Sequence, residues 1–576
     1  MSIEGPESTR EEQVGYIQRS AESTNDHKAG AGRFSINSAL ASTDEVHMEH
    51  SPDRTIVLGK VGVDEASADN AAIQADVAHD AWLDFRRDTY VGITDPHTDL
   101  EFLGRVVAGP FHSAEDSTSA ESYNTTGRIE VLGRIEEGER LVSTPTRPRP
   151  GSVIHAFPES RLRKFLGIGG DILIGHFAGH DTLRVSADST SKNFLPRNVG
   201  IFGTVGSGKS NTAQVLIEEA VQAGWAVVVV DVEGEYVRMD ERSNDPRMIR
   251  ILAEEYQMEP DGIRDFHVYH PSSGRSDAKN PVAFKIPISA LDPDIAADIL
   301  EFNEAEMRVF GMVTTQAALY AEPDDESGES ARPYTLQNLI DGLMEVPGIG
   351  GNTVRLLPLS NAEDVATASV VRSKLSHLGG SEMMDWNHTV GVDELPIQDL
   401  LVGGRLSVLD VSETDDRSRN LAIAYVLQTL FDMVIETPRG EEMPSGQIRP
   451  PVLVVIEEVH TFVSRAAASK MRALLDNLQV ISRRGRKRWM ALALVSQQPN
   501  HVPDEMFELA NTRFIHQIKS KTNLDPVKET TGGVDEKLWS SIPSMEPGRC
   551  LFAGSVFKNP LFVDVRPARS RRMLVA

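Results

Sequence analysis

The octapeptide Gly203-Thr-Val-Gly-Ser-Gly-Lys209-Ser210 constrains the fold of this 576-residue chain more than any other stretch. An apolar run, Val199–Phe202, precedes it, and Asn211–Ala223 after it has the apolar spacing of a helix. In such a strand–loop–helix unit, glycines let successive backbone N–H groups turn inward around an anion, and the helix directs the positive end of its dipole at the same place. The sequence therefore predicts an α/β fold with a phosphate-binding loop rather than a glycine-rich surface loop.

The residues of this loop have distinct expected roles toward a nucleoside triphosphate. Lys209 is expected to reach the β- and γ-phosphates, and the Ser210 hydroxyl to coordinate Mg²⁺. The other residues that we expect to contact the nucleotide are Gly203, Gly206, Ser207, Gly208 and Asn211.

Two carboxylates end a second apolar run. In Val452–Glu458, five apolar residues lead directly into Glu457 and Glu458. Ligands of open α/β sheets bind at the carboxyl ends of the strands, so these acids are expected near the phosphates. We expect Glu457 to hold Mg²⁺ through water, and Glu458 to orient and deprotonate the attacking water. The alternative is a solvated strand end with no chemical role.

A third strand and the basic segment before it supply further candidates. Gln497 follows the apolar run Met490–Val495, and its amide can hydrogen-bond the γ-phosphate and the attacking water together. The segment Arg483–Arg488 holds five cations in six residues. Arg486 or Arg483 could act as an arginine finger on a neighbouring subunit's γ-phosphate. The segment could instead line a DNA channel or form a solvated helix end.

Two other groups are weaker candidates. Asp231, Glu235 and Tyr236 follow a predicted buried strand, and a nucleotide-facing role and a structural role are equally compatible with them. His176 and His180 have a spacing that suggests metal binding, but they lie in a Gly-containing strand–turn. Ordinary turn polarity is the better interpretation of these histidines.

The composition limits the partners of the chain. It has 85 Asp and Glu against 58 Lys and Arg, a formal net charge of −27, and only 15 lysines among its basic residues. An acidic, lysine-poor, arginine-rich surface favours solubility in concentrated salt, so we prefer a halophilic origin to an ordinary acidic cytosolic enzyme. The net charge argues against a polybasic coat, so any contact with DNA must come from a local basic lining.

The sequence also indicates a cellular location. Cys550 is the single cysteine, so no internal disulfide can form. The N-terminus lacks the charged-then-apolar pattern of a signal peptide, and the longest apolar runs have the length of strands. We therefore expect a cytoplasmic protein without a membrane segment.

Patterns along the chain predict its domains. We expect a disordered polar tail at 1–50, a small β-barrel at 51–190, a nucleotide-binding core at 191–286 and 386–576, and a helical insertion at 287–385. The β-patterned runs of the barrel include Thr55–Val61, Thr89–Ile93, Leu103–Ala108, Arg128–Ile135 and Ile172–Phe177. The helix-patterned runs of the insertion are Ser289–Leu300, Glu304–Ala321, Thr335–Val346 and Ala366–Leu378.

Several segments together resemble one known family. In chain order they are IGHFAGHDTLRVSADS, NVGIFGTVGSGKSN, VVVVDVEGEY, VLVVIEEVH, SRRGRKRWMALALVSQQP, NTRFIHQI and PGRCLFAGSVFKNPLFVDVRP. This series is similar to that of the HerA family of archaeal DNA-translocating ATPases, from about residue 55 to 569. The resemblance is weakest in the helical insertion.

The resemblance implies a RecA-like core with a helical insertion, preceded by a small barrel, in a hexameric ring. In such rings ATP binds at subunit interfaces with Mg²⁺, and DNA passes through the centre, often with the nuclease NurA in end resection. Lys209 and Ser210 match the family's phosphate loop, Glu458 its catalytic glutamate, and Gln497 its sensor glutamine. The trans-acting arginine falls within the basic segment, where we favour Arg486 over Arg483.

Two positions depart from the family pattern. The usual Asp-Glu pair is Glu457-Glu458, which weakens the metal role of Glu457. The usual His before the phosphate-loop strand is Asn198, which leaves the organisation of the hinge between barrel and core open.

The resulting functional hypothesis is an ATP-driven DNA translocase or helicase. It would act as a homohexamer on duplex ends in double-strand-break repair, with a NurA-like nuclease as partner. The alternative is an ATP-switched scaffold that activates a nuclease without processive movement. A GTPase is a remote third possibility, because no Asn-Lys-x-Asp signature is present.

Overall fold

The computed structural model describes twelve segments of the chain. They are residues 56–63, 72–114, 123–136, 140–142, 146–319, 334–347, 353–355, 362–379, 383–384, 394–466, 468 and 471–573. The predicted tail at 1–50 lies outside these residues.

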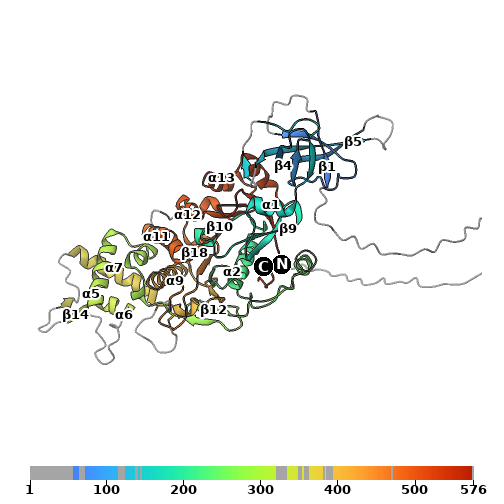
Figure 1. The fold of residues 1–576 in the computed structure, drawn as a ribbon. Coiled ribbons are helices and arrows are strands. Elements are labelled where there is room, and N and C mark those ends of the chain that lie inside the picture. Colours follow the sequence, from blue (N-terminus) through green and yellow to red (C-terminus); the bar gives the residue numbers. More distant parts are fainter. Residues whose placement is uncertain are drawn as a thin grey trace, which may run out of the picture. The chain divides into compact units, whose positions relative to one another are not determined.

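The N-terminal strands form a closed barrel (Figure 1, blue). The strands are β1 (Val57–Val61), β2 (Ala72–Val77), β3 (Tyr90–Thr94), β4 (Glu101–Ala114), β5 (Tyr123–Glu136), β6 (Arg140–Val142) and β7 (Val153–Ala156). Their order is β2-β1-β7-β3-β4-β5-β6, and a further β2–β5 pairing closes six of them into a ring. Alternate residues such as Leu58, Val91 and Phe102 point into a core in which each is at most 1% exposed. The predicted small barrel is confirmed.

A second, larger sheet holds the rest of the strands of the core. Its strands are β8 (Ile172–Phe177), β9 (His180–Ala187), β10 (Val199–Phe202), β11 (Ala226–Asp231), β12 (Phe266–Pro271), β13 (Val282–Phe284), β16 (Leu406–Asp410), β17 (Val452–Ile456), β18 (Met490–Ser496), β19 (Thr512–Ile515), β20 (Arg549–Ala553) and β21 (Leu561–Val565). Among the described residues their order is β13-β12-β16-β11-β17-β18-β10-β19-β20-β21-β8-β9. The strands from β13 to β19 are parallel, and those from β19 to β9 are antiparallel. The predicted α/β core is therefore present.

One strand belongs to a different sheet from the one we expected. Ile172–Phe177 was expected in the small barrel, but β8 pairs with β21 from the far end of the sequence. A period-two apolar pattern identifies a strand without identifying its partner, which explains the error.

Helices flank the larger sheet. They are α1 (Glu159–Leu166), α2 (Lys209–Gln222), α3 (Pro246–Ile251), α8 (Ile397–Leu400), α9 (Asp416–Glu436), α10 (Val459–Phe462), α11 (Arg472–Arg488), α12 (Asp504–Leu509), α13 (Lys521–Glu529) and α14 (Glu536–Ser541). Short 3-10 turns occupy Leu195–Arg197, Ile288–Ala290, Pro499–His501 and Ile542–Ser544, and a π-helical turn occupies Leu252–Tyr256.

The helical insertion is built from α4 (Pro293–Ile299), α5 (Glu304–Leu319), α6 (Leu336–Gly342) and α7 (Ala362–Gly379), with a hairpin of β14 (Glu345–Pro347) and β15 (Thr353–Arg355). Two predicted helices are shorter than expected. The first begins at Pro293, because the Asp292 carboxylate caps it by accepting from Asp294 N and Ile295 N. The predicted helix Thr335–Val346 ends at Gly342, since Val346 pairs with Val354 in the hairpin.

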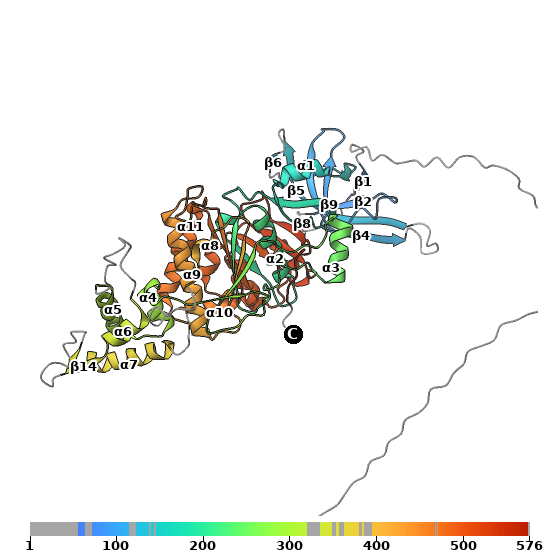
Figure 2. The same cartoon turned by 90° about the horizontal axis from the view of Figure 1, so that it is seen from below.

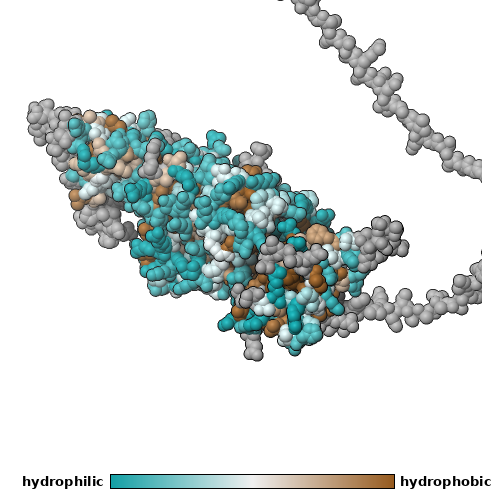
Figure 3. Space-filling view, turned by 90° about the horizontal axis from the view of Figure 1, so that it is seen from above, coloured by the Kyte–Doolittle hydropathy of each residue, from teal (hydrophilic) through white to brown (hydrophobic). Residues whose placement is uncertain are grey.

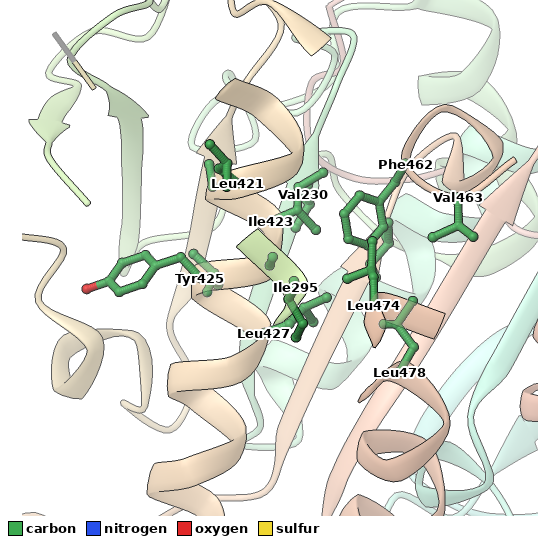
Figure 4. Packing of buried hydrophobic residues seen from close by; sticks show 14 of the residues in the cluster. Val230, Ile295, Leu421, Ile423, Tyr425, Leu427, Phe462, Val463, Leu474 and Leu478 are labelled. Atoms are coloured by element: carbon green, nitrogen blue, oxygen red, sulfur yellow. The ribbon is translucent and has the colours of Figure 1, made fainter. Parts of the chain in front are cut away.

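Buried side chains fix α9 and α11 against the parallel strands. Figure 2 shows the two helices side by side, and Figure 4 shows Leu427 of α9 on the side toward Leu474 and Leu478 of α11. Each of these leucines is at most 2% exposed, and burying one contributes about 1.5–3 kcal/mol. The packing holds the basic end of α11 in a defined place relative to the sheet.

The outer surface is mostly polar. Hydrophilic residues dominate the face shown in Figure 3, with apolar residues in scattered groups. Within the described segments, no helix combines the length and apolar character needed to cross a membrane.

Asn198 connects the start of β10 to its surroundings. It is 2% exposed, its Nδ2 donates to Ser482 Oγ (2.6 Å) and Leu509 O (3.0 Å), and its Oδ1 accepts from Leu492 N (2.9 Å). A buried amide thus joins β10, β18, α11 and the residue that ends α12.

We predict that Asn198→Ala lowers the free energy of unfolding by about 3 kcal/mol, because it leaves a buried backbone N–H and C=O without partners. Chemical denaturation measures the change, and Asn193→Ala, at an exposed site in the preceding turn, is the control. Equal stability of the two variants would contradict the bridging role of Asn198.

Candidate functional site

The phosphate-binding loop connects the carboxyl end of β10 to α2. Gly206 (φ 75°) and Gly208 (φ 108°) adopt left-handed conformations that favour glycine. A Cβ on Gly208 would lie 2.9 Å from Gly548 N, and one on Gly203 would lie 2.6 Å from Ser207 Oγ. The predicted loop conformation therefore requires glycine at these positions.

Polar groups of the loop are buried around an anion site. Lys209 is 3% exposed, and burial lowers the pKa of its ammonium group while the Glu458 carboxylate opposes this shift. Its Nζ donates to Thr204 O at 3.1 Å, which places the cation over the loop. The buried Ser207 Oγ has no hydrogen-bond partner in the protein. Ser210 lies half-buried in the first turn of α2. A cation, a free hydroxyl and the α2 amino end fit a bound polyphosphate.

His516 is a site residue that the sequence analysis did not identify. It follows β19, the parallel neighbour of β10, and its Nε2 lies 2.9 Å from Thr212 Oγ1 on α2. It is fully buried, and burial together with the Lys209 charge lowers its pKa to about 3. A neutral imidazole thus contacts the first turns of α2, directly after the phosphate loop. The sequence signal that could have identified His516 is its position directly after an apolar strand, where ligands of parallel sheets bind.

Asn211 lies in the first turn of α2, and its side chain contacts a distant part of the sequence. Its Nδ2 donates to Arg566 O at 2.8 Å, and its Oδ1 accepts from Ala568 N at 2.9 Å. Both ends of the side-chain amide are therefore engaged with the C-terminal segment. The contact of Asn211 with the nucleotide stays a prediction, and its side chain ties that segment to α2.

Glu458 lies in a strained turn directly after β17. Its φ of 44° and ψ of 52° are left-handed, which costs a non-glycine residue about 1–2 kcal/mol. The carboxylate is buried: Oε2 accepts from Gln497 N at 3.1 Å, and Oε1 has no partner in the protein. Such strain is typical of functional sites. The free oxygen suits a general base that accepts a proton from water.

Glu457 points to a different partner. It is 1% exposed, and its Oε2 accepts a hydrogen bond from Tyr236 OH at 2.8 Å. Burial raises the pKa of Glu457 to about 8, and the neighbouring Glu458 adds to this shift. A carboxyl held in this way favours a structural role for Glu457 over a magnesium role.

The loop after β11 is organised by Asp231. Its carboxylate accepts from the backbone N–H groups of Gly234 (2.8 Å) and Tyr236 (2.8 Å), while burial raises its pKa to about 7. The two alternatives left open by the sequence are thus resolved for Asp231, which has a structural role. Among the described residues, no three acidic, histidine or cysteine side chains are grouped as a metal site. Mg²⁺ commonly uses one or two protein oxygens with phosphates and water, so Ser210 fits it here.

Gln497 lies between the loop and Glu458. It follows β18, which pairs with both β10 and β17, and is partly exposed. Its backbone N–H bonds the Glu458 carboxylate, so the structure brings these two predicted residues together.

Arg483 and Arg486 lie at the opposite edge of the sheet. They line a cavity of about 230 Å³ together with Arg197 and Asn198, which precede β10, and residues of α12. The phosphate loop follows the other end of β10. The neighbouring strand β18 has seven residues, so the two edges of the sheet are roughly 20 Å apart. These arginines therefore cannot reach the phosphate loop of their own subunit.

The sheet order and the site define a P-loop ATP-hydrolysing enzyme, with β10 carrying the loop and β17 the acids. The family model described as "Helicase HerA, central domain" matches residues 172–430. Over these residues the chain is similar to the HerA family, as the motifs indicated.

Curated relatives and solved structures extend the comparison. HerA of Pyrococcus furiosus, a DNA double-strand break repair helicase, is 22% identical over 475 residues, covering 77% of this chain and 78% of that one. HerA of Saccharolobus solfataricus is 22% identical over 452 residues, and the alignment covers 77% of each of the two chains. VirB4 of Thermoanaerobacter pseudethanolicus superposes with a TM-score of 0.46 at 15% identity, covering 69% of this chain and 97% of that one.

We predict that Glu458→Gln binds ATP normally but hydrolyses it at least about 100-fold more slowly, because an amide cannot accept the proton of water. Glu457→Gln is the matched control, since it changes the adjacent carboxyl that bonds Tyr236. Steady-state phosphate release and nucleotide-analogue binding measure the two properties. Trapping of ATP by Glu457→Gln alone would show that the two carboxyls have exchanged roles.

Proposed function

We propose that the protein is an ATP-driven DNA translocase or helicase. It would act as a homohexameric ring at duplex ends during double-strand-break repair, with a NurA-like nuclease as partner. The relationship to HerA helicases supports the DNA substrate, and the phosphate loop with Glu458 supports ATP hydrolysis.

The chain's own residues account for the chemistry of hydrolysis. Glu458 Oε1 takes a proton from water, whose oxygen then attacks the γ-phosphorus as ADP leaves. Lys209 neutralises charge on the β- and γ-phosphates, and the Gln497 amide orients the water. Mg²⁺, held with the help of Ser210, would supply further neutralisation of the phosphate oxygens.

The observation that carries the ring proposal is the position of Arg483 and Arg486. They lie at the edge of the sheet opposite to the phosphate loop, so either residue could act as an arginine finger only on the phosphate loop of a neighbouring subunit. A ring of identical subunits repeats this interface and leaves no site without a partner.

The same helix end supplies a local basic surface. Within the described part of the chain, no ion pair is formed by Arg484, Lys487 or Arg488, although the protein has a net charge of −27. Unpaired cations in an acidic protein suit a polyanion, so these three residues are candidates for contact with DNA phosphates.

The experiment that tests the function measures ATPase activity with and without linear duplex DNA. We expect stimulation by DNA ends in the wild type and none in Lys209→Ala. Nuclease activation without displacement of the protein along single DNA molecules would favour the scaffold alternative. A wild type that no DNA stimulates would contradict the proposal.

We predict that Arg486→Ala lowers turnover by about 1,000-fold while leaving nucleotide binding intact, as loss of an arginine finger does. Lysine at this position should not restore activity well, because a point charge lacks the planar fork of guanidinium. Mixing Arg486→Ala with Glu458→Gln subunits should regain part of the activity, since some interfaces then combine an intact Glu458 with an intact Arg486. An inactive mixture, together with a reduced salt dependence of DNA binding by Arg486→Ala, would identify a DNA contact instead.

A further inference from the structure

The buried carboxylate of Glu458 has a second side-chain partner, His460. Glu458 Oε2 lies 3.1 Å from His460 Nδ1, and the two side chains are 3% and 15% exposed. The same oxygen accepts from Gln497 N, also at 3.1 Å. Both contacts hold one oxygen and leave Oε1 free.

A special backbone turn brings these two residues together. Residues two apart on a strand point to the same face, but Glu458 lies beyond β17 in a left-handed conformation at the start of α10, and His460 is in α10. Thr461 stabilises the turn, because its N and Oγ1 both donate to Glu458 O, at 2.8 and 2.9 Å. The position of His460 is thus determined by the same turn that directs Glu458.

The groups around His460 indicate which of its two ring nitrogens carries the proton. Ser496 Oγ lies 3.4 Å from His460 Nδ1 and accepts from Gln498 N at 3.2 Å. The His501 ring is 6.2 Å away, centroid to centroid. Glu458 is therefore the nearest acceptor for a proton on Nδ1, which assigns the Nδ1–H tautomer to the neutral ring.

We propose that His460 is a positioning residue that holds Glu458 Oε2 through Nδ1–H, so that Oε1 faces the attacking water. This rests on the proposed hydrolytic function of the same site. A carboxylate fixed at one oxygen loses rotational freedom, and its other oxygen stays aligned for proton transfer. His460 acts through Glu458 and contacts no phosphate.

The test uses isosteres that separate the two nitrogens of the ring. Asparagine places an N–H donor near the position of Nδ1, whereas glutamine places it near Nε2. We expect His460→Asn to keep kcat within about 3-fold of wild type, and His460→Gln and His460→Ala to lose roughly 10- to 100-fold. The KM for ATP and the binding of a fluorescent ATP analogue should stay unchanged in all three.

His501→Asn is the matched control, because His501 neighbours His460 and is exposed, whereas Glu458 accepts hydrogen bonds from Gln497 N and His460. Unchanged kcat in His460→Ala, or equal loss in His460→Asn and His460→Gln, would overturn the proposal. If His460→Ala unfolds, the comparison of the asparagine and glutamine variants still decides. A wild type that does not hydrolyse ATP would contradict the proposed function instead.

Discussion

The parallel pairing of β10 with β18 and β19 is the constraint on which the rest of the site depends. Strands that run in the same direction end at the same edge of a sheet, so the loop after β10, Gln497 after β18 and His516 after β19 meet there. β17 adds Glu458 through its own pairing with β18. Hydrogen bonds between backbones, rather than contacts between side chains, thus bring four distant parts of the sequence together.

Local sequence patterns predicted those parts of the fold whose conformation depends on neighbouring residues in the sequence. Val452–Ile456 was predicted with the bounds that the structure shows, because five consecutive apolar residues ending in acids are typical of a buried parallel strand. The phosphate loop could be predicted since glycine is required where φ is positive. The proximity of Glu458 and Gln497 then followed from strand ends that meet at one edge.

The sequence could not predict what long-range partners decide. Nothing in Asn211 itself shows that its amide will be used by Arg566 and Ala568, and the pattern of β8 does not show that β21 is its neighbour. The left-handed turn at Glu458 was equally hidden, because non-glycine residues adopt it only where the surroundings enforce it. These are features of tertiary packing, which periodicity does not encode.

The C-terminal segment that binds Asn211 has a consequence for biosynthesis. Asn211 and Arg566 are 355 residues apart, and Gly548 N donates to Ser207 O within the loop itself. A ribosome adds about 5–20 residues per second, so the loop exists for tens of seconds before its closing strands emerge. During that interval the half-made core exposes an unpaired edge of the sheet. Only when β20 and β21 have emerged do β19 and β8 gain the neighbours that cover their edges, so completion of this sheet depends on the last part of the chain to be synthesised.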